Sequence, residues 1–276
     1  MQETHFIHHI FSEKSKLTGL LPDKPLTALF VEELFCFLFT RNIKGNAEED
    51  IANQLNALRE TTKNLLTQCG GDIDEVNKNV AVFFESVPGI FTELSLDAQA
   101  ILKFDPAANS LEEVLLAYPG FFAIAVYRFA HQFYIQKIRL LPRMMCAYSH
   151  SKTGIDIHPA ALIGKSFFID HGTGVVVGET TVIGNDVKIY QGVTLGALNV
   201  SKAYANKKRH PTISDNVVIY AGATILGGET VIGSGSVIGG NVWLTYSVAP
   251  NSIVYHKSEI KIRDNNPLPE AINFVI

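Results

Sequence analysis

The sequence lacks the features that mark several large classes of protein. Its 276 residues include 23 lysines and arginines against 27 aspartates and glutamates, so the net charge is −4 and no broad basic surface is expected for nucleic acid. The only three cysteines, Cys36, Cys69 and Cys146, are too widely spaced for a metal-ligand pattern. An odd and sparse set of thiols indicates a reducing compartment.

Long hydrophobic runs and targeting patterns are also missing. The most apolar run, residues 26–39, is interrupted by Glu32 and Glu33 and is too short to span a bilayer. The first fourteen residues do not place basic residues ahead of an apolar stretch, as a signal peptide does. We therefore expect a cytoplasmic, soluble protein with no membrane partner.

The first half of the chain has the pattern of a helical domain. Pro25 can open a helix, Gly70-Gly71 can end one, and Pro88-Gly89 is expected to break another. Ser110 and Glu113 form a capping box ahead of an apolar run. Broad apolar faces suggest that these helices pack on each other and on other subunits. Helices are expected over residues 25–41, 47–69, 72–84, 90–105, 110–118 and 120–137.

A six-residue repeat organises the second half, from Ile155 to about Tyr255. Each unit has an aliphatic residue followed by a small or polar one, with another small residue at the fifth place. Repeats of this length are typical of a parallel β-helix, in which the aliphatic residues point inward and three units close one triangular coil. The repeated positions are Ile157, Ile163, Ile169, Val175, Val177, Ile183, Ile189, Leu195, Ile213, Ile219, Ile225, Ile232, Ile238 and Leu244.

The repeat is irregular at two places that also carry ionisable residues. It slips by two residues just after Asp170-His171, and it is broken between Gly196 and Pro211 by a basic segment that ends in Arg209-His210. Such a segment can be only a solvated excursion. The repeat resumes directly after this segment, which favours a functional loop, because functional loops are often carried by rigid scaffolds.

Together these patterns predict an α+β protein. We expect an N-terminal helical oligomerisation domain over residues 1–145, a catalytic β-helix over 146–256 and a C-terminal tail over 257–276. Repetition alone does not give the hand of the β-helix, and it does not give the function either, since many acyltransferases and some non-catalytic proteins share it.

His171 is a candidate general base because a neutral imidazole accepts a proton near pH 7. Asp156 lies fifteen residues earlier, close to one coil, so it can reach the imidazole and hold its tautomer. From spacing alone, two satisfied turn residues are an equal alternative. Asp105-Pro106, between two helices, reads first as a turn and a helix cap.

Several segments make the chain resemble the serine O-acetyltransferase family, which are hexapeptide-repeat enzymes. The resemblance covers residues from about Asp105 to Val248, and its most specific words are DHGTGVVVGET and RHPTI in this order. It implies that the β-helix is left-handed. The matching segments are DPA (105–107), DIHPAALIG (156–164), IDHGTGVVVGET (169–180), QGVTLG (191–196), KRHPTI (208–213) and YAGATILGGETVIG (220–233).

The resemblance implies roles for these matching positions. His171 would remove the proton from the hydroxyl of L-serine as it attacks acetyl-CoA, and Asp156 would orient His171. Backbone N–H groups would stabilise the oxyanion, CoA would leave with a proton from His171, and neither an acyl-enzyme nor a metal is needed. In this family, the product O-acetylserine is used for cysteine biosynthesis.

Substrate contacts follow in the same way. Arg209 and His210 would hold the substrate carboxylate, Asp105 and Asp170 would meet its ammonium and hydroxyl region, and Glu179 would support these residues without touching substrate. Small residues would let the pantetheine arm of acetyl-CoA approach the backbone in a cleft between subunits. The positions for acetyl-CoA are Gly196, Ala197, Ala221 and Gly222.

The resemblance also implies partners. We expect a homotrimer or a dimer of trimers, inhibition by cysteine at the serine site, and binding of cysteine synthase by the C-terminal Ile276. The chain departs from the family at Gly196-Ala197-Leu198, where Gly-Gly-Thr is common, and in its longer basic loop. Two alternatives remain open: an acetyltransferase for another small hydroxyl acceptor, and a non-catalytic regulator that binds cysteine synthase.

Overall fold

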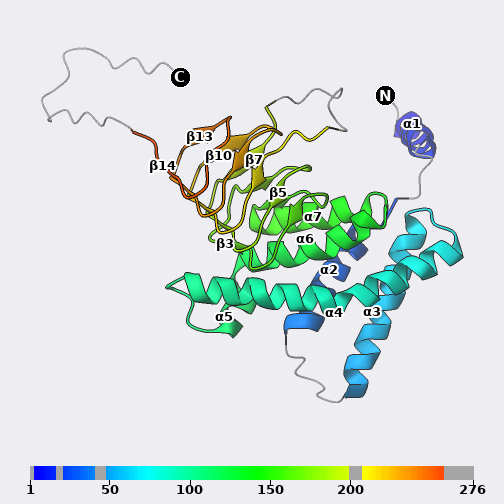
Figure 1. Cartoon of the computed structure of the whole chain (residues 1–276). Helices are drawn as coiled ribbons and strands as arrows, with labels where there is room; N and C mark the ends of the chain where they lie inside the picture. The colour runs from blue at the N-terminus through cyan, green and yellow to red at the C-terminus, as the bar shows by residue number, and fades with distance from the viewer. Residues whose placement is uncertain (1–2, 17–20, 41–47, 199–206, 258–276) are drawn as a thin grey trace, which may run out of the picture.

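A computed structural model describes residues 3–16, 21–40, 48–198 and 207–257 of the chain, as a helical part followed by a stack of short strands (Figure 1). The predicted tail contact through Ile276 lies outside the described residues. The helices are α1 (Glu3–Ser15), α2 (Lys24–Phe39), α3 (Glu48–Gln68), α4 (Ile73–Phe104), α5 (Leu111–Ala117), α6 (Pro119–Ile135) and α7 (Leu141–Thr153).

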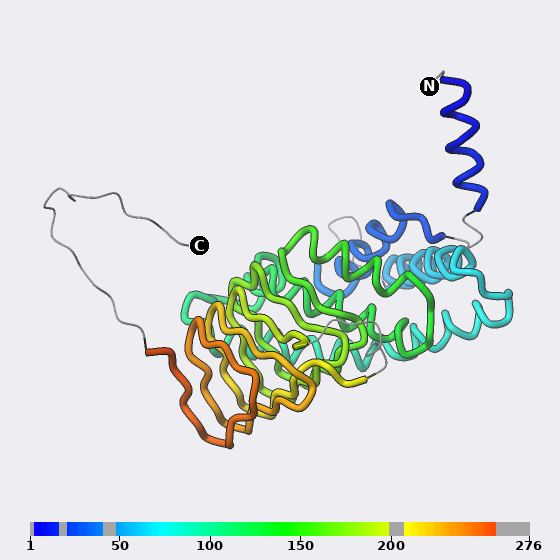
Figure 2. Tube along the Cα trace, turned by 90° about the horizontal axis from the view of Figure 1, so that it is seen from above, coloured from blue at the N-terminus to red at the C-terminus, as the bar shows by residue number. Residues whose placement is uncertain are grey.

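The helical part differs from the sequence expectation in three elements. The expected break at Pro88-Gly89 is wrong, because α4 continues through Pro88. An internal proline costs about 3 kcal/mol, but Phe84, Ile90 and Leu94 on either side of it are buried, and each such side chain contributes about 1.5–3 kcal/mol. Two helices were not predicted: α7, and α1, which has no buried residue and stands apart from the body (Figure 2).

The capping box predicted at Ser110 and Glu113 is present, and a cap at Asp72 accompanies it. The Ser110 hydroxyl accepts a hydrogen bond from the backbone N–H of Glu113 at 3.2 Å, and the Glu113 carboxylate accepts one from the N–H of Asn109 at 2.8 Å. Asp72 caps α4 in the same way through the N–H groups of Asp74 and Glu75. These polar ends fix where the helices start.

The strands build the left-handed parallel β-helix that the repeat and the family resemblance predict. They form three parallel sheets: the first has the order β1-β4-β7-β10-β13, the second β11-β8-β5-β2 and the third β14-β12-β9-β6-β3. The strands are β1 (Asp156–Ile157), β2 (Leu162–Ile163), β3 (Phe168–Ile169), β4 (Val176–Val177), β5 (Val182–Ile183), β6 (Lys188–Ile189), β7 (Thr194–Gly196), β8 (Thr212–Ile213), β9 (Val218–Ile219), β10 (Thr224–Leu226), β11 (Val231–Ile232), β12 (Val237–Ile238), β13 (Trp243–Leu244) and β14 (Ile253–Val254).

The inward positions are those of the repeat. Every aliphatic residue named above is buried except Ile163, which is half-buried. The register stacks like on like, with Ile157 beside Val177, Val177 beside Leu195 and Leu195 beside Ile225. The core of the β-helix is therefore a set of aliphatic columns, as the sequence predicts.

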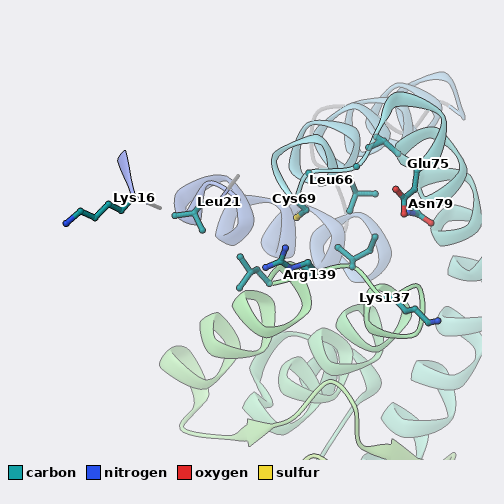
Figure 3. A pocket seen from close by; sticks show the side chains of 13 residues that line it. Lys16, Leu21, Leu66, Cys69, Glu75, Asn79, Lys137 and Arg139 are labelled. Carbon is teal, nitrogen blue, oxygen red and sulfur yellow. The ribbon is translucent and has the colours of Figure 1, made fainter. Parts of the chain in front are cut away.

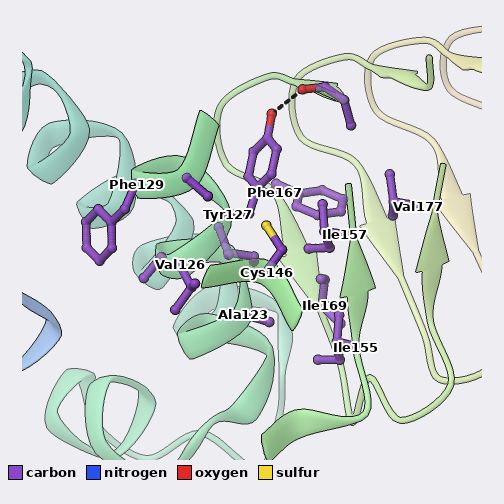
Figure 4. Packing of buried hydrophobic residues seen from close by; sticks show 14 of the residues in the cluster. Ala123, Val126, Tyr127, Phe129, Cys146, Ile155, Ile157, Phe167, Ile169 and Val177 are labelled. Carbon is purple, nitrogen blue, oxygen red and sulfur yellow. Dashed lines mark hydrogen bonds between the residues drawn. The ribbon is translucent and has the colours of Figure 1, made fainter. Parts of the chain in front are cut away.

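The first coil rests on the helices through close packing and one polar joint (Figure 4). The Tyr127 hydroxyl of α6 donates to the carbonyl of Ala161 at 2.6 Å. At Gly120, the position of an added Cβ would be 2.2 Å from the carbonyl oxygen of Ile169, so α6 approaches β3 as closely as a glycine permits. The start of the β-helix is thus fixed on α4, α6 and α7.

No single helix among the described residues is both long and apolar enough to cross a membrane. The pair α5 and α6 meets the length and composition criterion only together, across a bend of 72°.

Candidate active site

Two corners of the β-helix depart from the regular repeat, and both border the first sheet. Six residues (170–175) connect β3 to β4, whereas four (190–193) connect β6 to β7 in the next coil. On the other side, fifteen residues (197–211) connect β7 to β8, whereas four (178–181) connect β4 to β5. We call them the His171 corner (170–175, 190–193, 220–223 and 239–242) and the Arg209 corner (158–161, 178–181, 207–211 and 227–230).

The two extra residues of the first coil present His171 to solvent. His171 has φ 54°, in the left-handed region, and its side chain is 72% exposed. Its Nδ1 lies 3.7 Å from Oδ1 of Asp170, which is itself only 14% exposed. An exposed imidazole beside a partly buried carboxylate can accept a proton from a bound alcohol.

A second carboxylate lies at this corner, brought there by the helical part. Asp105, which ends α4, accepts hydrogen bonds from the Tyr118 hydroxyl at 2.7 Å and from the Ala107 N–H at 2.8 Å. Burial raises the pKa of Asp170, the Asp105 carboxylate raises it further, and His171 acts in the opposite direction. A cation placed between Asp105 and Asp170 would relieve their mutual repulsion.

Thr180 organises the Arg209 corner, although sequence reasoning did not select it. Its hydroxyl accepts hydrogen bonds from the N–H groups of Arg209 at 2.9 Å and His210 at 3.1 Å. The Nζ of Lys208 donates to the carbonyls of Thr180 and His210, both at 2.9 Å. Only the coil register, which brings residues 180 and 210 together, could have indicated this role.

His210 is held in a defined neutral form. Its Nδ1 accepts a hydrogen bond from the Thr180 N–H at 3.1 Å, so the proton of the neutral ring is on Nε2. Burial lowers the pKa of His210 to about 4, with Arg209 acting in the same direction. The ring lies over Gly178, where an added Cβ would be 2.0 Å from its Cδ2. His210 can therefore donate from Nε2 at neutral pH without carrying a charge.

Arg209 supplies the positive charge at this corner. Its guanidinium forms an ion pair with Glu179, and the side chains are 23% and 33% exposed. The supporting role expected of Glu179 stays a prediction. A hollow of about 320 Å³ at this corner is lined by Lys207, Lys208 and Arg209 and by one carboxylate, that of Glu229. The three cationic residues outnumber the carboxylate, so the hollow favours anionic groups.

Asp156 lies between the two corners, on the outer side of the first sheet. It is half-buried on β1, beside Val176 of β4. In the described part of this chain, no hydrogen bond joins Asp156 to His171, so its orienting role stays a prediction. Next along the chain, His158 accepts the Ala160 N–H at 3.0 Å, and burial lowers its pKa to about 4.

The expected acetyl-CoA positions are divided between the same two corners. Gly196 ends β7 and Ala197 begins the long connection to β8, whereas Ala221 and Gly222 lie at the His171 corner. Gly222 has φ 71°, and an added Cβ there would be 2.4 Å from Oδ1 of Asn241. The structure therefore places the predicted residues in two groups, not in one.

A further hollow lies in the helical part. This cavity of about 670 Å³ is lined by Leu66, Cys69, Glu75 and Arg139 among others, and by none of the predicted site residues (Figure 3). Within the described residues, no group of three or more His, Cys, Asp or Glu side chains is arranged to hold a metal ion.

Comparison with known proteins relates this arrangement to one family. No family model matches the chain. A plasmid-encoded serine acetyltransferase of Synechococcus elongatus is 49% identical over 212 residues, which are 75% of this chain and 63% of the relative. A serine acetyltransferase of Bacillus pumilus is 44% identical over 66% of this chain and 82% of the relative. The chain belongs to the serine acetyltransferase family.

Solved serine acetyltransferases share the fold. Isoform 3 of Entamoeba histolytica, in complex with cysteine, matches with a TM-score of 0.77 and 36% identity over 86% of this chain and 84% of that one. The enzyme of Neisseria gonorrhoeae, in complex with serine, matches with a TM-score of 0.59 and 29% identity over 84% and 95%. The likeness to the serine acetyltransferases thus extends over the helical part as well as the β-helix.

Proposed function

We propose that the protein transfers the acetyl group of acetyl-CoA to the hydroxyl of L-serine, giving O-acetyl-L-serine and CoA. The observation that carries this is the division of charge between the two corners. Carboxylates and an exposed imidazole lie at one corner, and Arg209 with a neutral His210 lies at the other. This division complements an amino acid that carries an ammonium, a hydroxyl and a carboxylate.

Each group of serine has a counterpart. Asp105 and Asp170 receive the ammonium, whose charge favours the ionised form of both carboxylates. The Arg209 guanidinium pairs with the serine carboxylate, and His210 donates a hydrogen bond to it from Nε2. The hydroxyl is then directed at His171.

The reaction is a direct acyl transfer. His171 takes the hydroxyl proton while the serine oxygen forms a bond to the thioester carbonyl carbon. The resulting tetrahedral oxyanion collapses, the carbon–sulfur bond breaks, and the CoA sulfur receives the proton from the imidazolium. Asp170 stabilises the imidazolium within a chain, and Asp156 contributes to its orientation in the assembled site.

The complete site is shared between neighbouring subunits of a trimer. In the described part of one protomer, no hydrogen bond or ion pair joins His171, Asp170 or Asp105 to Glu179 or His210. Since the two corners flank β4, a ring of copies around a three-fold axis brings the His171 corner of each subunit to the Arg209 corner of the next. The helical part joins two such trimers.

The sharing has a direct test with mixed subunits. His171→Ala and Arg209→Ala chains, each inactive alone, are refolded together in equal amounts. A shared site then has an intact His171 in half of the cases and an intact Arg209 from the neighbouring subunit in half of those, so about a quarter of the wild-type activity returns. Absence of recovery in mixed assemblies verified by mass spectrometry would place both residues in one subunit's site.

The activity itself is tested by identifying the product with purified protein. Acetyl-CoA is supplied with serine, homoserine or a sugar, thiol release is followed, and the product is analysed by mass spectrometry. His171→Ala lowers serine acetylation by about 100- to 10,000-fold, whereas His150→Ala, at an exposed site on α7, leaves it unchanged. Transfer to the sugar alone would replace serine as the acceptor, and no transfer at all would favour a non-catalytic regulator.

Cysteine occupies the serine site, and the C-terminus binds cysteine synthase. Cysteine has the same ammonium and carboxylate as serine, and serine acetyltransferase 1 and isoform 3 of Entamoeba histolytica were both solved with cysteine bound. Competition between cysteine and serine in steady-state kinetics tests whether cysteine binds at the serine site.

Binding of cysteine synthase by the C-terminus has its own test. Removal of Ile276 abolishes co-elution with cysteine synthase, and undiminished co-elution would refute this contact.

A further inference from the structure

A row of side chains follows the third sheet at the His171 corner. Each of its strands is succeeded by one outward-facing residue, and the register places these residues one above another. From the helical end upward they are Asp170, Tyr190, Tyr220, Gly239 and Tyr255. We call this row the tyrosine ladder; it contains one glycine among its aromatic residues.

The lower part of the ladder is already stacked. The rings of Tyr190 and Tyr220 are 5.1 Å apart between centroids with an interplanar angle of 14°. Below them, Phe168 meets Tyr190 edge-on at 6.2 Å. Tyr220 is nevertheless 44% exposed, because the next position above it is Gly239 and carries no side chain. One face of its ring is therefore open.

Gly239 keeps the coil above it in close contact. Its φ is not in the positive region, but an added Cβ would lie 3.0 Å from the carbonyl oxygen of Val254 and 3.4 Å from the Cα of Tyr255, so a side chain there would press on the next strand. The same Cβ would lie 3.6 Å from the Cβ of Tyr255, which shows that the Tyr255 side chain leaves the coil on the same side. Tyr255 is 76% exposed. Gly239 thus keeps a gap open between two exposed tyrosines.

The gap has the height of one flat ring. Two strand spacings of about 4.8 Å separate the levels of Tyr220 and Tyr255. A planar group halfway between them would be about 4.8 Å from each level, close to the 5.1 Å of the existing pair and within the range preferred by stacked aromatic rings.

We propose that this gap binds the adenine ring of acetyl-CoA, between Tyr220 and Tyr255. The proposal rests on the proposed function, which makes acetyl-CoA the donor. Tyr220 immediately precedes Ala221 and Gly222, at the corner where His171 meets the thioester, so one ligand can extend upward along this edge. Lys257, two residues after Tyr255, gives the upper end a positive charge for phosphate groups.

The test separates binding of the adenine ring from catalysis. It uses two acetyl donors, acetyl-CoA and acetyl-pantetheine, and one nucleotide fragment of CoA, adenosine 3′,5′-bisphosphate. Tyr220→Ala and Tyr255→Ala weaken binding of adenosine 3′,5′-bisphosphate, measured by calorimetry, by about tenfold, the size expected for one lost stacking face. They raise the KM for acetyl-CoA by the same factor relative to the KM for acetyl-pantetheine, which has no nucleotide. Tyr220→Phe and Tyr255→Phe keep the ring and retain binding.

Tyr246→Ala is the matched control, because Tyr246 is 68% exposed but follows β13 on the other side of the first sheet. Unchanged bisphosphate binding in both alanine variants, with thermal melting like that of the wild type, would overturn the proposal. So would an equal rise in the KM of both donors. If the unmodified protein acetylated no serine, the proposed function would fail, whereas the calorimetry would still decide whether the ladder binds the nucleotide.

Discussion

Tyr118 holds one of the two carboxylates at the His171 corner, and its role was not evident from the sequence. It ends α5, precedes α6 and donates its hydroxyl proton to Asp105 at 2.7 Å. This hydrogen bond, followed by burial, raises the pKa of Tyr118 to about 12, so the hydroxyl remains a donor at any working pH. Tyr118 is therefore a positioning residue for Asp105.

Tyr118→Phe tests that role. The variant frees the Asp105 carboxylate to rotate away from the position proposed for the serine ammonium, and a hydrogen bond to a charged group contributes about 1.5–3 kcal/mol. We expect the KM for serine to rise on the order of tenfold, while kcat and the KM for acetyl-CoA change by less than about twofold. Tyr246→Phe is the control. A fall in kcat with an unchanged serine KM would contradict the assignment.

Two histidines make stability depend on pH. The folded-state pKa of His158 and of His210 is lowered to about 4 by burial, below the ordinary value of 6.5. Between these values the unfolded chain binds more protons than the folded one, so the free energy of unfolding decreases as the pH falls from about 6.5 to about 4.

His158→Asn keeps an acceptor near the Ala160 N–H but cannot be protonated, so its stability changes less between pH 7 and pH 5 than that of the wild type. Urea denaturation at the two pH values measures the difference. His150→Asn, at an exposed position, serves as the control. Parallel pH dependences for wild type and His158→Asn would show that this site does not contribute.

At the scale of elements, the regular part of the β-helix could be predicted and its corners only in outline. Inward positions such as Ile189 and Leu195 repeat at fixed spacing, so the spacing alone predicts that their side chains are buried. The slip after His171 indicated an irregular corner, but the contact between Asp105 and Tyr118 depends on how α4 and α6 meet, which no local pattern encodes. The same holds for α4, where packing overrides the helix-breaking tendency of Pro88.

Gly178→Ala tests the close packing at the Arg209 corner. The new methyl group would occupy the position of the His210 ring, so the ring must move and lose its hydrogen bond from Thr180. We expect kcat/KM for serine to fall by at least about tenfold, with the larger part in KM, because a misplaced binding group acts on the substrate carboxylate. Steady-state kinetics measures the change.

Gly89→Ala is the matched control for this substitution. Gly89 lies in α4 with ordinary φ and no atom within 4 Å of an added Cβ, and alanine favours helix. Equal kinetics of Gly178→Ala and the wild type would show that the His210 ring position does not matter for binding.

At the scale of the whole molecule, one buried ion pair links the helices to the β-helix. Arg128 of α6 donates to Asp97 of α4 at 2.7 and 3.0 Å and to the carbonyl of Gly164 at 2.8 Å, while Asp97 also accepts the Phe167 N–H at 2.8 Å. Burial raises the pKa of Asp97 and Arg128 opposes that rise. Neither residue can be removed without leaving a buried polar group unpaired.

Arg128→Met should therefore lower the free energy of unfolding by about 3–5 kcal/mol, the cost of breaking a buried pair. Chemical denaturation followed by circular dichroism measures it. Lys152→Met removes an ion pair with Glu32 whose side chains are 47% and 34% exposed, and it should cost less than about 1 kcal/mol. If both variants lowered the free energy of unfolding by the same amount, the Arg128–Asp97 pair would not have the structural role assigned to it.

The stacking of coils has a mechanical consequence. The strands of each turn pair only with those of the turn before and the turn after it, and the lowest turn packs against α4, α6 and α7. Tension applied to the C-terminal end would detach the strands one after another from that end of the β-helix, beginning with β14 and β13. The proposed nucleotide site between Tyr220 and Tyr255 would be lost while His171, in the lowest turn, was still in place. Such a chain would lose affinity for acetyl-CoA before it lost its proposed general base.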